Sequence, residues 1–382
     1  MKKTSFCKGF FIFGGVFLLG MLGGCVKNSC IDSSLALSRD IPSKNSGKPT
    51  LVYVMPPSNF LGDTEVMTRL VLTAKEMGWN TFLYDEIEQK PVKNRGDFFG
   101  IYIPLKYNYA HLDDGSEKKL SIPNVPLFAI DWLIPSNMIT EPEKCAAFLE
   151  RASNLGVEGV LGTSNKMIDG AVKKRCMAGN IKFLMTWYPT VAATSYQPNP
   201  VNLMYCGDKY FENIRSESDK YKALWKALDE TGYFFVYGTK HAWENLTSYQ
   251  GRLPADGKSF VHAINEHGIY LVLHDEKHLK EGVPSGRIFE GAAASAVIIC
   301  DNHPFIKREF KDSVLYIDET RDDLFEQIEA HMRWIKENPE KAKFKAANAH
   351  SIFLEKFTFE EQLSRFYKYF RIVQNNLNKH ER

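Results

Sequence analysis

The chain lacks any run of like charge, and its charges nearly cancel. It has 48 Lys and Arg residues against 46 Asp and Glu residues, which gives a formal net charge of +2 at pH 7. Proteins that bind nucleic acid through its phosphates usually carry a basic patch or stripe. The composition therefore gives no reason to propose a nucleic acid as a partner.

Several catalytic signatures are also missing. The sequence contains no P-loop, no GxSxG motif and no HExxH motif, so ATPase, esterase and zinc-protease activities lack their minimal parts. It has neither a DxD motif nor a CxxC pair with metal-ligand spacing. We therefore expect no metal site.

The chain has few cysteines, and they are scattered. Of the seven, Cys7 and Cys25 lie near the N-terminus, and the other five are widely spaced and odd in number, which does not fit a disulfide framework. Cys206 and Cys300 fall in strand-like runs, where a thiol behaves as a small hydrophobe. This usage is typical of a cytosolic protein and conflicts with the N-terminal segment.

The first 30 residues resemble a bacterial export signal. Lys2, Lys3 and Lys8 precede an apolar run over Gly9–Gly24, and the sequence LGGC ends at Cys25. This pattern resembles a lipobox, in which that cysteine would carry the lipid. The run is short for a membrane span of about 20 residues, which favours a lipoprotein signal over an uncleaved anchor. The lysines would keep the N-terminus in the cytoplasm and place the body of a membrane-attached protein outside it.

Behind a polar tether at residues 31–47, short apolar runs alternate with helical patterns. Such alternation predicts an α/β domain with a largely parallel sheet. A first domain is expected over 48–190, because prolines and small polar residues at 189–200 interrupt the pattern. A second alternation over 200–320 predicts another such domain, and helices are expected over 321–382. We therefore expect an α/β fold of two Rossmann-like domains that face a central cleft, with a helical C-terminus.

Single elements can be placed from the same patterns. Strands are expected at 50–56, 81–87, 98–105, 125–132, 202–207, 233–238, 267–274, 295–301 and 313–318. Helices are expected at 63–78, 145–156, 167–179, 218–231, 321–337, 339–355 and 358–377.

The stretch SGRIFEGAAASAVIICD at residues 285–301 carries the strongest functional signal. Ser285 is placed to cap a helix through its hydroxyl, and the positive end of that helix suits a phosphate. Arg287 and Glu290 lie on one helix face. An arginine there can pair with a diphosphate, and a carboxylate can accept both hydroxyls of a ribose. The small residues 291–295 permit close packing of the helix on a sheet.

Further polar residues and glycines follow the predicted strands of the second domain. Ligands of open α/β sheets bind beyond the carboxyl ends of the strands, where glycine lets the backbone approach them. The residues at such positions, or close behind them, are Gly207, Lys209, Arg215, Arg252, His274, Asp275 and Asp301. A plain ion pair between Arg287 and Glu290, and a structural role for a half-buried His274, are the alternatives.

The order of these segments resembles a known family. A strand followed by glycine and basic residues, then FVYG, YQGRLP and GIYLVLH, and finally SGRIFEGAAASAVIICDNHPF, is similar to the donor-binding half of GT-B glycosyltransferases. Among these it most resembles the bacterial glycosyltransferase-family-1 type group that includes spore-maturation-like proteins. The resemblance covers about residues 200–320, whereas residues 48–190 match in architecture alone.

The resemblance implies roles for single positions. Glu290 would bind the ribose of the nucleotide, and Ser285 and Arg287 would lie near its diphosphate. Lys209 or Arg215 would neutralise the diphosphate, and His274 would line the sugar side.

One departure from the family pattern leaves the catalytic group open. Many retaining members carry a second Glu eight residues before the ribose one, and this chain has Gly282 there. The candidates are His274, Asp275, the adjacent Glu281, and Asp131 at a strand end of the first domain. Retention and inversion both stay possible.

Two functions follow from these observations. The first is a glycosyltransferase that moves a sugar from a nucleotide sugar to a sugar, lipid or protein acceptor, with no cofactor besides this co-substrate. The second is a non-catalytic, membrane-anchored lipoprotein that retains the fold and binds a saccharide or a protein. The export signal supports the second, since nucleotide sugars are cytoplasmic, but intact Ser285, Arg287 and Glu290 favour the first. An uncleaved anchor with the body on the cytoplasmic face would reconcile the two.

Overall fold

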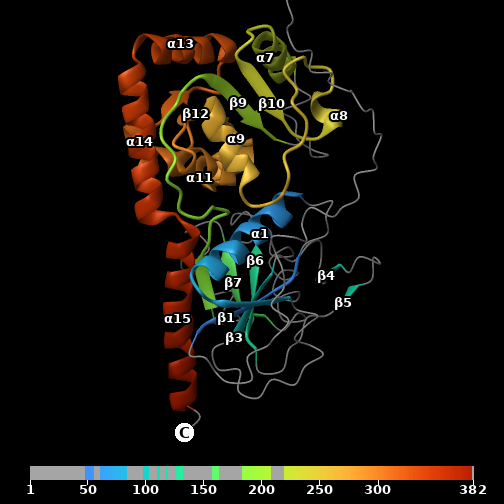
Figure 1. The fold of residues 1–382 in the computed structure, drawn as a ribbon, viewed down its shortest axis with the longest axis vertical. Helices are drawn as coiled ribbons and strands as arrows, with labels where there is room; N and C mark the ends of the chain where they lie inside the picture. Colours follow the sequence, from blue (N-terminus) through green and yellow to red (C-terminus); the bar gives the residue numbers. More distant parts are fainter. Residues whose placement is uncertain are drawn as a thin grey trace, which may run out of the picture.

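The computed structural model describes residues 48–55, 61–83, 98–102, 110–111, 117–118, 125–131, 157–162, 183–207 and 219–380. Within them the chain forms two α/β units, each built on its own parallel sheet (Figure 1). An extended segment without regular structure, residues 187–201, connects the two sheets. The predicted fold class, two Rossmann-like halves with a helical C-terminus, is confirmed.

The N-terminal unit contains a sheet whose described strands all pair in parallel, in the order β2-β1-β3-β6-β7-β8. These strands are β1 (Thr50–Tyr53), β2 (Asn80–Leu83), β3 (Phe98–Tyr102), β6 (Leu127–Asp131), β7 (Val157–Gly162) and β8 (Phe183–Thr186). Helix α1 (Leu61–Glu76) follows β1 and buries Met67, Leu70 and Val71 in the core of this unit. Two short strands, β4 (Ala110–His111) and β5 (Glu117–Lys118), form a separate antiparallel pair.

The C-terminal unit contains a second parallel sheet, in the order β10-β9-β11-β12-β13. Its strands are β9 (Asn202–Cys206), β10 (Phe234–Tyr237), β11 (Gly268–Val272), β12 (Val297–Asp301) and β13 (Leu315–Ile317). Every residue of β11 and β12 is buried. Parallel strands read as continuous apolar runs when helices cover both faces of the sheet, which is why the sequence located these two strands well.

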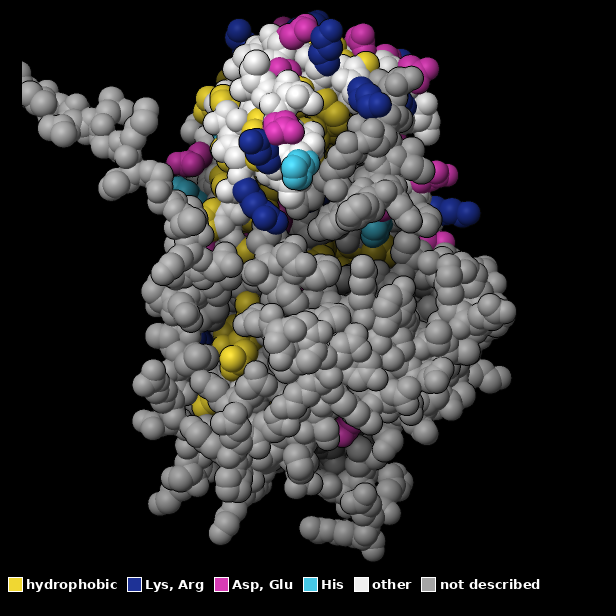
Figure 2. Space-filling view, turned by 90° about the vertical axis from the view of Figure 1, so that its right-hand side faces the viewer, with side chains coloured by type: hydrophobic (Ala, Val, Ile, Leu, Met, Phe, Trp, Pro, Cys, Tyr) yellow, Lys and Arg dark blue, Asp and Glu magenta, His cyan; other side chains and the backbone are white. Residues whose placement is uncertain are grey.

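The helices of the C-terminal unit fall on both faces of its sheet. Two separate apolar clusters, one containing residues of α9 and α11 and the other residues of α7 and α13, include alternating side chains of the same strands. The helices are α7 (Asp219–Asp229), α8 (Lys240–Trp243), α9 (Ser259–His267), α10 (Glu276–Glu281), α11 (Gly286–Ala293), α12 (Pro304–Glu309), α13 (Leu324–Glu337) and α14 (Pro339–Lys356). On the face drawn in Figure 2, Lys and Arg side chains lie among Asp and Glu over this unit, in keeping with the small net charge.

The small residues of α11 bring this helix close to the sheet. A Cβ added at Gly291 would lie 3.0 Å from Cδ1 of Tyr270 and 3.2 Å from Cγ1 of Ile298. The alanines 292–294 that follow have no exposed surface. The close helix–sheet packing predicted from this stretch is present.

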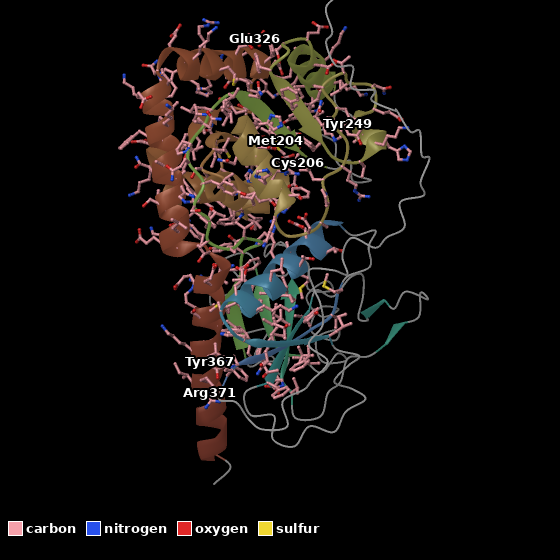
Figure 3. All side chains as sticks on the ribbon, in the orientation of Figure 1. Met204, Cys206, Tyr249, Glu326, Tyr367 and Arg371 are labelled. Atoms are coloured by element: carbon pink, nitrogen blue, oxygen red, sulfur yellow. The ribbon has the colours of Figure 1, made fainter. Side chains whose placement is uncertain are left out.

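The last helix, α15 (Phe359–His380), leaves the C-terminal unit and packs against the N-terminal one (Figure 1). Its apolar residues Phe359, Leu363, Phe366 and Phe370 are buried in the same cluster as the residues of β1, β3 and α1. Figure 3 labels Tyr367 on this helix; its ring lies 5.7 Å from that of Trp79 and 6.1 Å from that of Phe99. Among the described residues, no helix is both long and apolar enough to cross a membrane.

Candidate functional site

The strand order of the C-terminal sheet reverses between β9 and β11, and ligands of open α/β sheets bind at such a switch point. Arg287, in the first turn of α11, spans this point. Its Nε donates to the carbonyl of Cys206 at 2.8 Å, and its Nη1 donates to the carbonyl of Leu273 at 3.3 Å. Cys206 ends β9 and Leu273 follows β11. The guanidinium is thus fixed between the carboxyl ends of the two strands.

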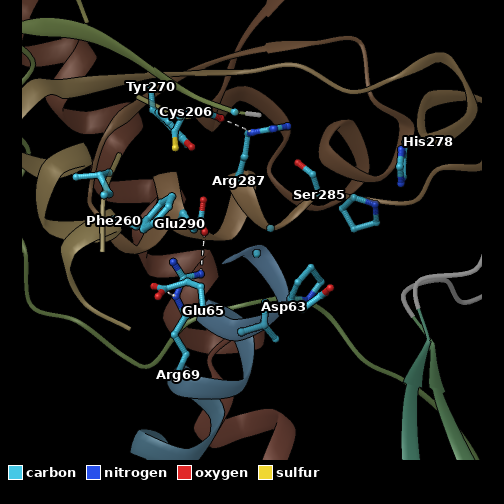
Figure 4. Close-up of a pocket in the computed structure, with 18 of the residues that line it drawn as sticks. Asp63, Glu65, Arg69, Cys206, Phe260, Tyr270, His278, Ser285, Arg287 and Glu290 are labelled. Carbon is cyan, nitrogen blue, oxygen red and sulfur yellow. Dashed lines mark hydrogen bonds and ion pairs between the residues drawn. The ribbon is translucent and has the colours of Figure 1, made fainter. Parts of the chain in front are cut away.

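A pocket of about 310 Å³ opens at this place, between α1 of the N-terminal unit and the loops of the C-terminal unit (Figure 4). Helix α1 forms one wall, and α11 with the loop before it forms another. Its lining residues are Gly62, Asp63, Glu65, Val66, Arg69, Pro189, Cys206, Gly207, Gly238, Arg252, Leu253, Phe260, Tyr270, His278, Val283, Pro284, Ser285, Gly286, Arg287 and Glu290.

Three polar atoms of the pocket walls are buried without a hydrogen-bond partner among the described residues. They are the hydroxyls of Ser285 and Tyr270 and the Nη2 of Arg69. A buried polar group left unpaired costs about 1–3 kcal/mol, so native structures rarely collect several in one place. Their convergence on one cavity indicates a polar ligand.

Ser285 occupies the N-cap position of α11, but its hydroxyl makes no capping hydrogen bond. The predicted hydroxyl cap is therefore wrong. The side chain lines the pocket instead, so its hydroxyl is available to a ligand. The residue type that suggested a cap on sequence grounds is equally suited to donate to a phosphate.

Arg287 and Glu290 lie on the same helix, and the structure gives no ion pair between them. Glu290 Oε1 instead accepts from Arg69 Nη1 of α1 at 2.8 Å. Arg69 Nε donates to Glu65 Oε1, also at 2.8 Å, and the second oxygen of Glu65 accepts from the backbone N–H of Gly257 at 2.9 Å. A chain of charged groups therefore crosses from α1 to α11.

Burial and the neighbouring groups shift the pKa values of these side chains in opposite directions. Burial alone would lower the pKa of Arg69, but the carboxylates of Glu65 and Glu290 outweigh it and raise that pKa. Burial raises the pKa of Glu65, in spite of the opposing attraction of Arg69. Burial would likewise lower the pKa of Arg287, yet its surroundings, Tyr205 first, raise it. Arg69 and Arg287 therefore remain cationic in the pocket.

The structure places His274 and Asp301 beneath the pocket rather than on its walls, contrary to the expectation that His274 lines the sugar side. Both are buried, and His274 Nδ1 lies 3.0 Å from Asp301 Oδ1. The second carboxylate oxygen accepts from the backbone N–H of His274 at 2.5 Å. Burial lowers the pKa of His274, although the bond to Asp301 opposes this. The carboxylate is turned inward because it satisfies these two groups.

One group of potential metal ligands occurs among the described residues. Atoms of His274, Cys300 and Asp301 lie within 4.8 Å of one another. The imidazole already bonds the carboxylate through its Nδ1, and its Nε2 is buried without a partner among the described residues. We assign no metal to it.

Asp275 supports a residue that the sequence analysis did not single out. Asp275 is the N-cap of α10, and its Oδ1 accepts from the backbone N–H of His278 at 2.8 Å. Its Oδ2 lies 2.5 Å from Nδ1 of the same histidine. His278 lines the pocket and its side chain is 34% exposed. The available signal was the spacing in HDEKH, where an aspartate after a strand precedes a histidine by three residues.

The remaining candidates are distributed as follows. Gly207 and Arg252 line the pocket. Glu281 ends α10 and is buried but does not line the pocket. Asp131 ends β6 in the other unit. The positions of Lys209, Arg215 and Cys25 lie outside the described residues, as do the predicted helices at 145–156 and 167–179.

Comparisons with known proteins bear on this site. Residues 215–368 match the model of a family described as glycosyl transferase-like. This match covers α11 and the whole C-terminal sheet except β9, and it confirms the function class predicted from the sequence. A comparison with curated protein sequences finds no match.

Solved structures of glycosyltransferases are similar to this chain. An α-glucosyltransferase in complex with UDP and a 13-mer DNA has a TM-score of 0.50 at 8% identity, over 83% of this chain and 98% of that one. A glycosyltransferase from Rickettsia africae has a TM-score of 0.48 at 11% identity, over 86% and 99% of the two chains. Anabaena HepE, in complex with UDP and glucose, has a TM-score of 0.48 at 9% identity, over 84% and 99%. The fold of this chain is that of GT-B glycosyltransferases.

Proposed function

We propose that this protein transfers a sugar from a nucleotide-sugar donor bound in the pocket to an acceptor hydroxyl. The observation that carries the proposal is the pocket at the switch point, where Arg287 is fixed between two strand ends and the buried hydroxyls of Ser285 and Tyr270 have no partner among the described residues. Cations and hydroxyl donors at such a place suit a diphosphate. Because the α-glucosyltransferase of the same fold was solved with UDP, a UDP-sugar is the first donor to test.

The labelled side chains of Figure 4 suggest how a donor would lie. Phe260 and Glu290 occupy one end of the pocket, Arg287 and Ser285 the middle, and His278 the other end. We assign the ribose to Glu290, the diphosphate to Arg287 and Ser285, and the transferred sugar to the end beside His278. Asp63 of α1 also lines the pocket, from the N-terminal unit.

Arg287 would act on the leaving group. During transfer the bond between the sugar carbon and the diphosphate oxygen breaks, and the nucleoside diphosphate leaves with an additional negative charge. A guanidinium already held by two carbonyls needs no rearrangement to stabilise that charge, and such preorganised groups make a large contribution to catalysis. Gly207 lies against the guanidinium of Arg287, because a Cβ at Gly207 would lie 3.0 Å from Arg287 Nη2.

His278 is the candidate for proton transfer. A new bond forms between the sugar carbon and the acceptor oxygen, whose proton must leave. A carboxylate at Nδ1 fixes the orientation of the imidazole and leaves Nε2 to act on a substrate, as in other histidine–carboxylate pairs. Asp275 holds His278 in this way. Asp275 then orients the base and is not the base itself.

The acceptor and the site of action belong to the proposal as well. The acceptor is a sugar, lipid or protein, and the N-terminal segment attaches the protein to a membrane through Cys25 or as an uncleaved anchor. Labelled palmitate with a Cys25→Ala control tests lipidation. Protease added to intact spheroplasts digests a body outside the cytoplasmic membrane and spares one inside it.

The donor assignment is tested by thermal unfolding of the protein with UDP-, GDP-, TDP- and CMP-sugars. A ligand at 100 times its Kd adds about 2.7 kcal/mol to the free energy of unfolding, which raises the Tm by several degrees. We expect a shift with one nucleotide that is lost in Glu290→Ala. If no nucleotide sugar shifts the Tm, the result favours the second function. That function is a lipoprotein that retains the fold and binds a saccharide or a protein.

A further inference from the structure

Arg69 belongs to the N-terminal unit, yet it forms part of the wall of the proposed donor pocket (Figure 4). Its side chain is 2% exposed, on the face of α1 that meets the C-terminal unit. Its guanidinium carbon lies 5.8 Å from the ring centre of Phe260, another pocket residue. A guanidinium so deeply buried is tolerated only where charged partners compensate for its lost hydration.

Two carboxylates provide this compensation from opposite sides. Glu65 accepts a hydrogen bond from the Nε of Arg69, and its other oxygen accepts one from the N–H of Gly257 in the C-terminal unit. Glu290 takes Nη1. Arg69 is thus held at both edges and has little freedom to move, while its Nη2 is buried without a partner among the described residues.

The bond to Arg69 uses one half of the Glu290 carboxylate. Oε1 accepts from Nη1 at 2.8 Å, and the structure gives Oε2 no hydrogen bond among the described residues. In Figure 4 the dashed line from Arg69 meets one oxygen of Glu290, and the other oxygen points the opposite way. Because the side chain is 12% exposed, the remaining oxygen can be reached from the pocket.

We propose that Arg69 is a positioning residue for the donor: it orients Glu290 toward the ribose and offers its own Nη2 to an oxygen of the same nucleoside. The inference rests on the proposed function, because it requires a nucleotide in this pocket. It adds that the N-terminal unit, and not the C-terminal unit alone, determines how strongly the ribose is held. The ribose hydroxyls then bind to the carboxylate of Glu290, which a residue of the N-terminal unit orients.

The alternative is that Arg69 only ties the two units together. The two roles differ in what they do to ribose recognition. An ion pair that merely stabilises the closed arrangement would change the affinity for a nucleotide with or without the 2′-hydroxyl by the same factor. A residue that orients Glu290 would change mainly the affinity for the nucleotide that carries the hydroxyl.

The test is calorimetric titration of the full chain with UDP and with 2′-deoxy-UDP. We expect the wild type to bind UDP about tenfold or more tightly than 2′-deoxy-UDP, the effect of one hydrogen bond to a charged group. Arg69→Met should weaken UDP binding about ten- to a hundredfold and bring the two affinities close together. Arg69→Lys should keep part of the preference, and it also serves if the methionine variant does not fold.

Two controls make the outcome decisive. Arg333→Met removes an exposed arginine of α13 and should leave both affinities unchanged. Glu65→Gln removes the charge from the other partner of Arg69 and should reduce the preference for UDP less than Arg69→Met does. If Arg69→Met and Arg69→Lys keep the wild-type ratio of the two affinities, the positioning role is wrong. If the wild type binds neither nucleotide, the proposed function itself fails, which is a different result.

Discussion

Tyr188 and Gln362 bond each other twice across 174 positions of the chain. The backbone N–H of Tyr188 donates to Gln362 Oε1 at 2.7 Å, and Gln362 Nε2 donates to the Tyr188 carbonyl at 3.1 Å. Tyr188 lies in the segment that leads from the N-terminal to the C-terminal unit, and Gln362 lies on α15, which returns. A side-chain amide thus joins the two places where the chain crosses between the units.

Gln362→Ala is expected to lower the free energy of unfolding by about 2–4 kcal/mol, because it leaves a buried N–H and a buried carbonyl unpaired. Urea unfolding measures the change. Lys368→Ala, an exposed position on the same helix, should alter the midpoint little. If Gln362→Ala unfolds with the midpoint and slope of the wild type, the double bond does not stabilise the crossing.

The local elements of the fold were predictable, and their partners were not. Helices expected at 321–337, 339–355 and 358–377 correspond to α13, α14 and α15, because their apolar periodicity is a property of the segment itself. Nothing in the periodicity of α15 shows that it packs on β1 and β3 rather than on its neighbours in sequence. The strands β7 and β8 were missed.

The candidate site divides in the same way. Gly207, Arg252 and the α11 residues Ser285, Arg287 and Glu290, which the sequence predicts to bind the donor, all line the pocket, and their contact with a donor stays a prediction. Arg69 was missed, since an arginine four residues after Glu65 reads as an ordinary helix-surface pair. Its second partner, Glu290, lies 221 positions away. Contacts of that kind depend on how the two units meet, which no local pattern encodes.

Glu290→Gln tests the ribose contact. The variant keeps the size of the side chain but removes the charge, and hydrogen bonds to charged groups contribute about 1.5–3 kcal/mol. We expect uridine and UDP to lose affinity by a similar factor, about ten- to a hundredfold, in calorimetric titrations. Glu326→Gln on the exposed face of α13 is the matched control. Unchanged binding of both ligands would place the ribose elsewhere.

Arg287→Lys tests the diphosphate contact and should give the opposite pattern. Lysine keeps the charge but has a single nitrogen in place of the planar guanidinium, which donates to Cys206 and Leu273 from two separate nitrogens. We expect UDP to bind about tenfold or more weakly, while uridine binds nearly as in the wild type. An equal loss for the two ligands in the same titrations would mean that Arg287 supports the pocket as a whole and does not contact the diphosphate.

His278→Ala is expected to separate catalysis from donor binding. Removal of a general base typically costs about 10²–10⁴-fold in rate, whereas the Kd for UDP should change less than about threefold if His278 lies beyond the diphosphate. Initial rates with the donor identified by thermal unfolding measure the first effect and titration the second. Asp275→Asn should lower the rate by a smaller factor, because it weakens only the hydrogen bond that orients the ring. A rate unaffected by either substitution removes His278 as the base.

His303 is buried, and its two hydrogen bonds require the neutral imidazole. Its Nε2 lies 3.0 Å from the carbonyl of Val283, so this nitrogen carries the proton and donates. Its Nδ1 accepts from the backbone N–H of Phe305 at 3.2 Å, which caps α12. Protonation of Nδ1 would place two donors against each other. Burial and then the neighbouring His274 lower the pKa of His303 to about 4.

The fold should therefore lose stability in mild acid through His303. The unfolded chain takes up a proton near the ordinary histidine pKa of 6.5, and the folded chain resists until about pH 4. The unfolded state thus binds more protons between these values, and the free energy of unfolding falls by about 2 kcal/mol from pH 7 to pH 5 on this account. Asn at 303 can still accept from the N–H of Phe305 but does not titrate. Urea unfolding at both pH values should show a drop that is smaller in His303→Asn than in the wild type, since every other titrating group is common to the two chains. Equal drops would mean that His303 does not contribute to the acid sensitivity of the fold.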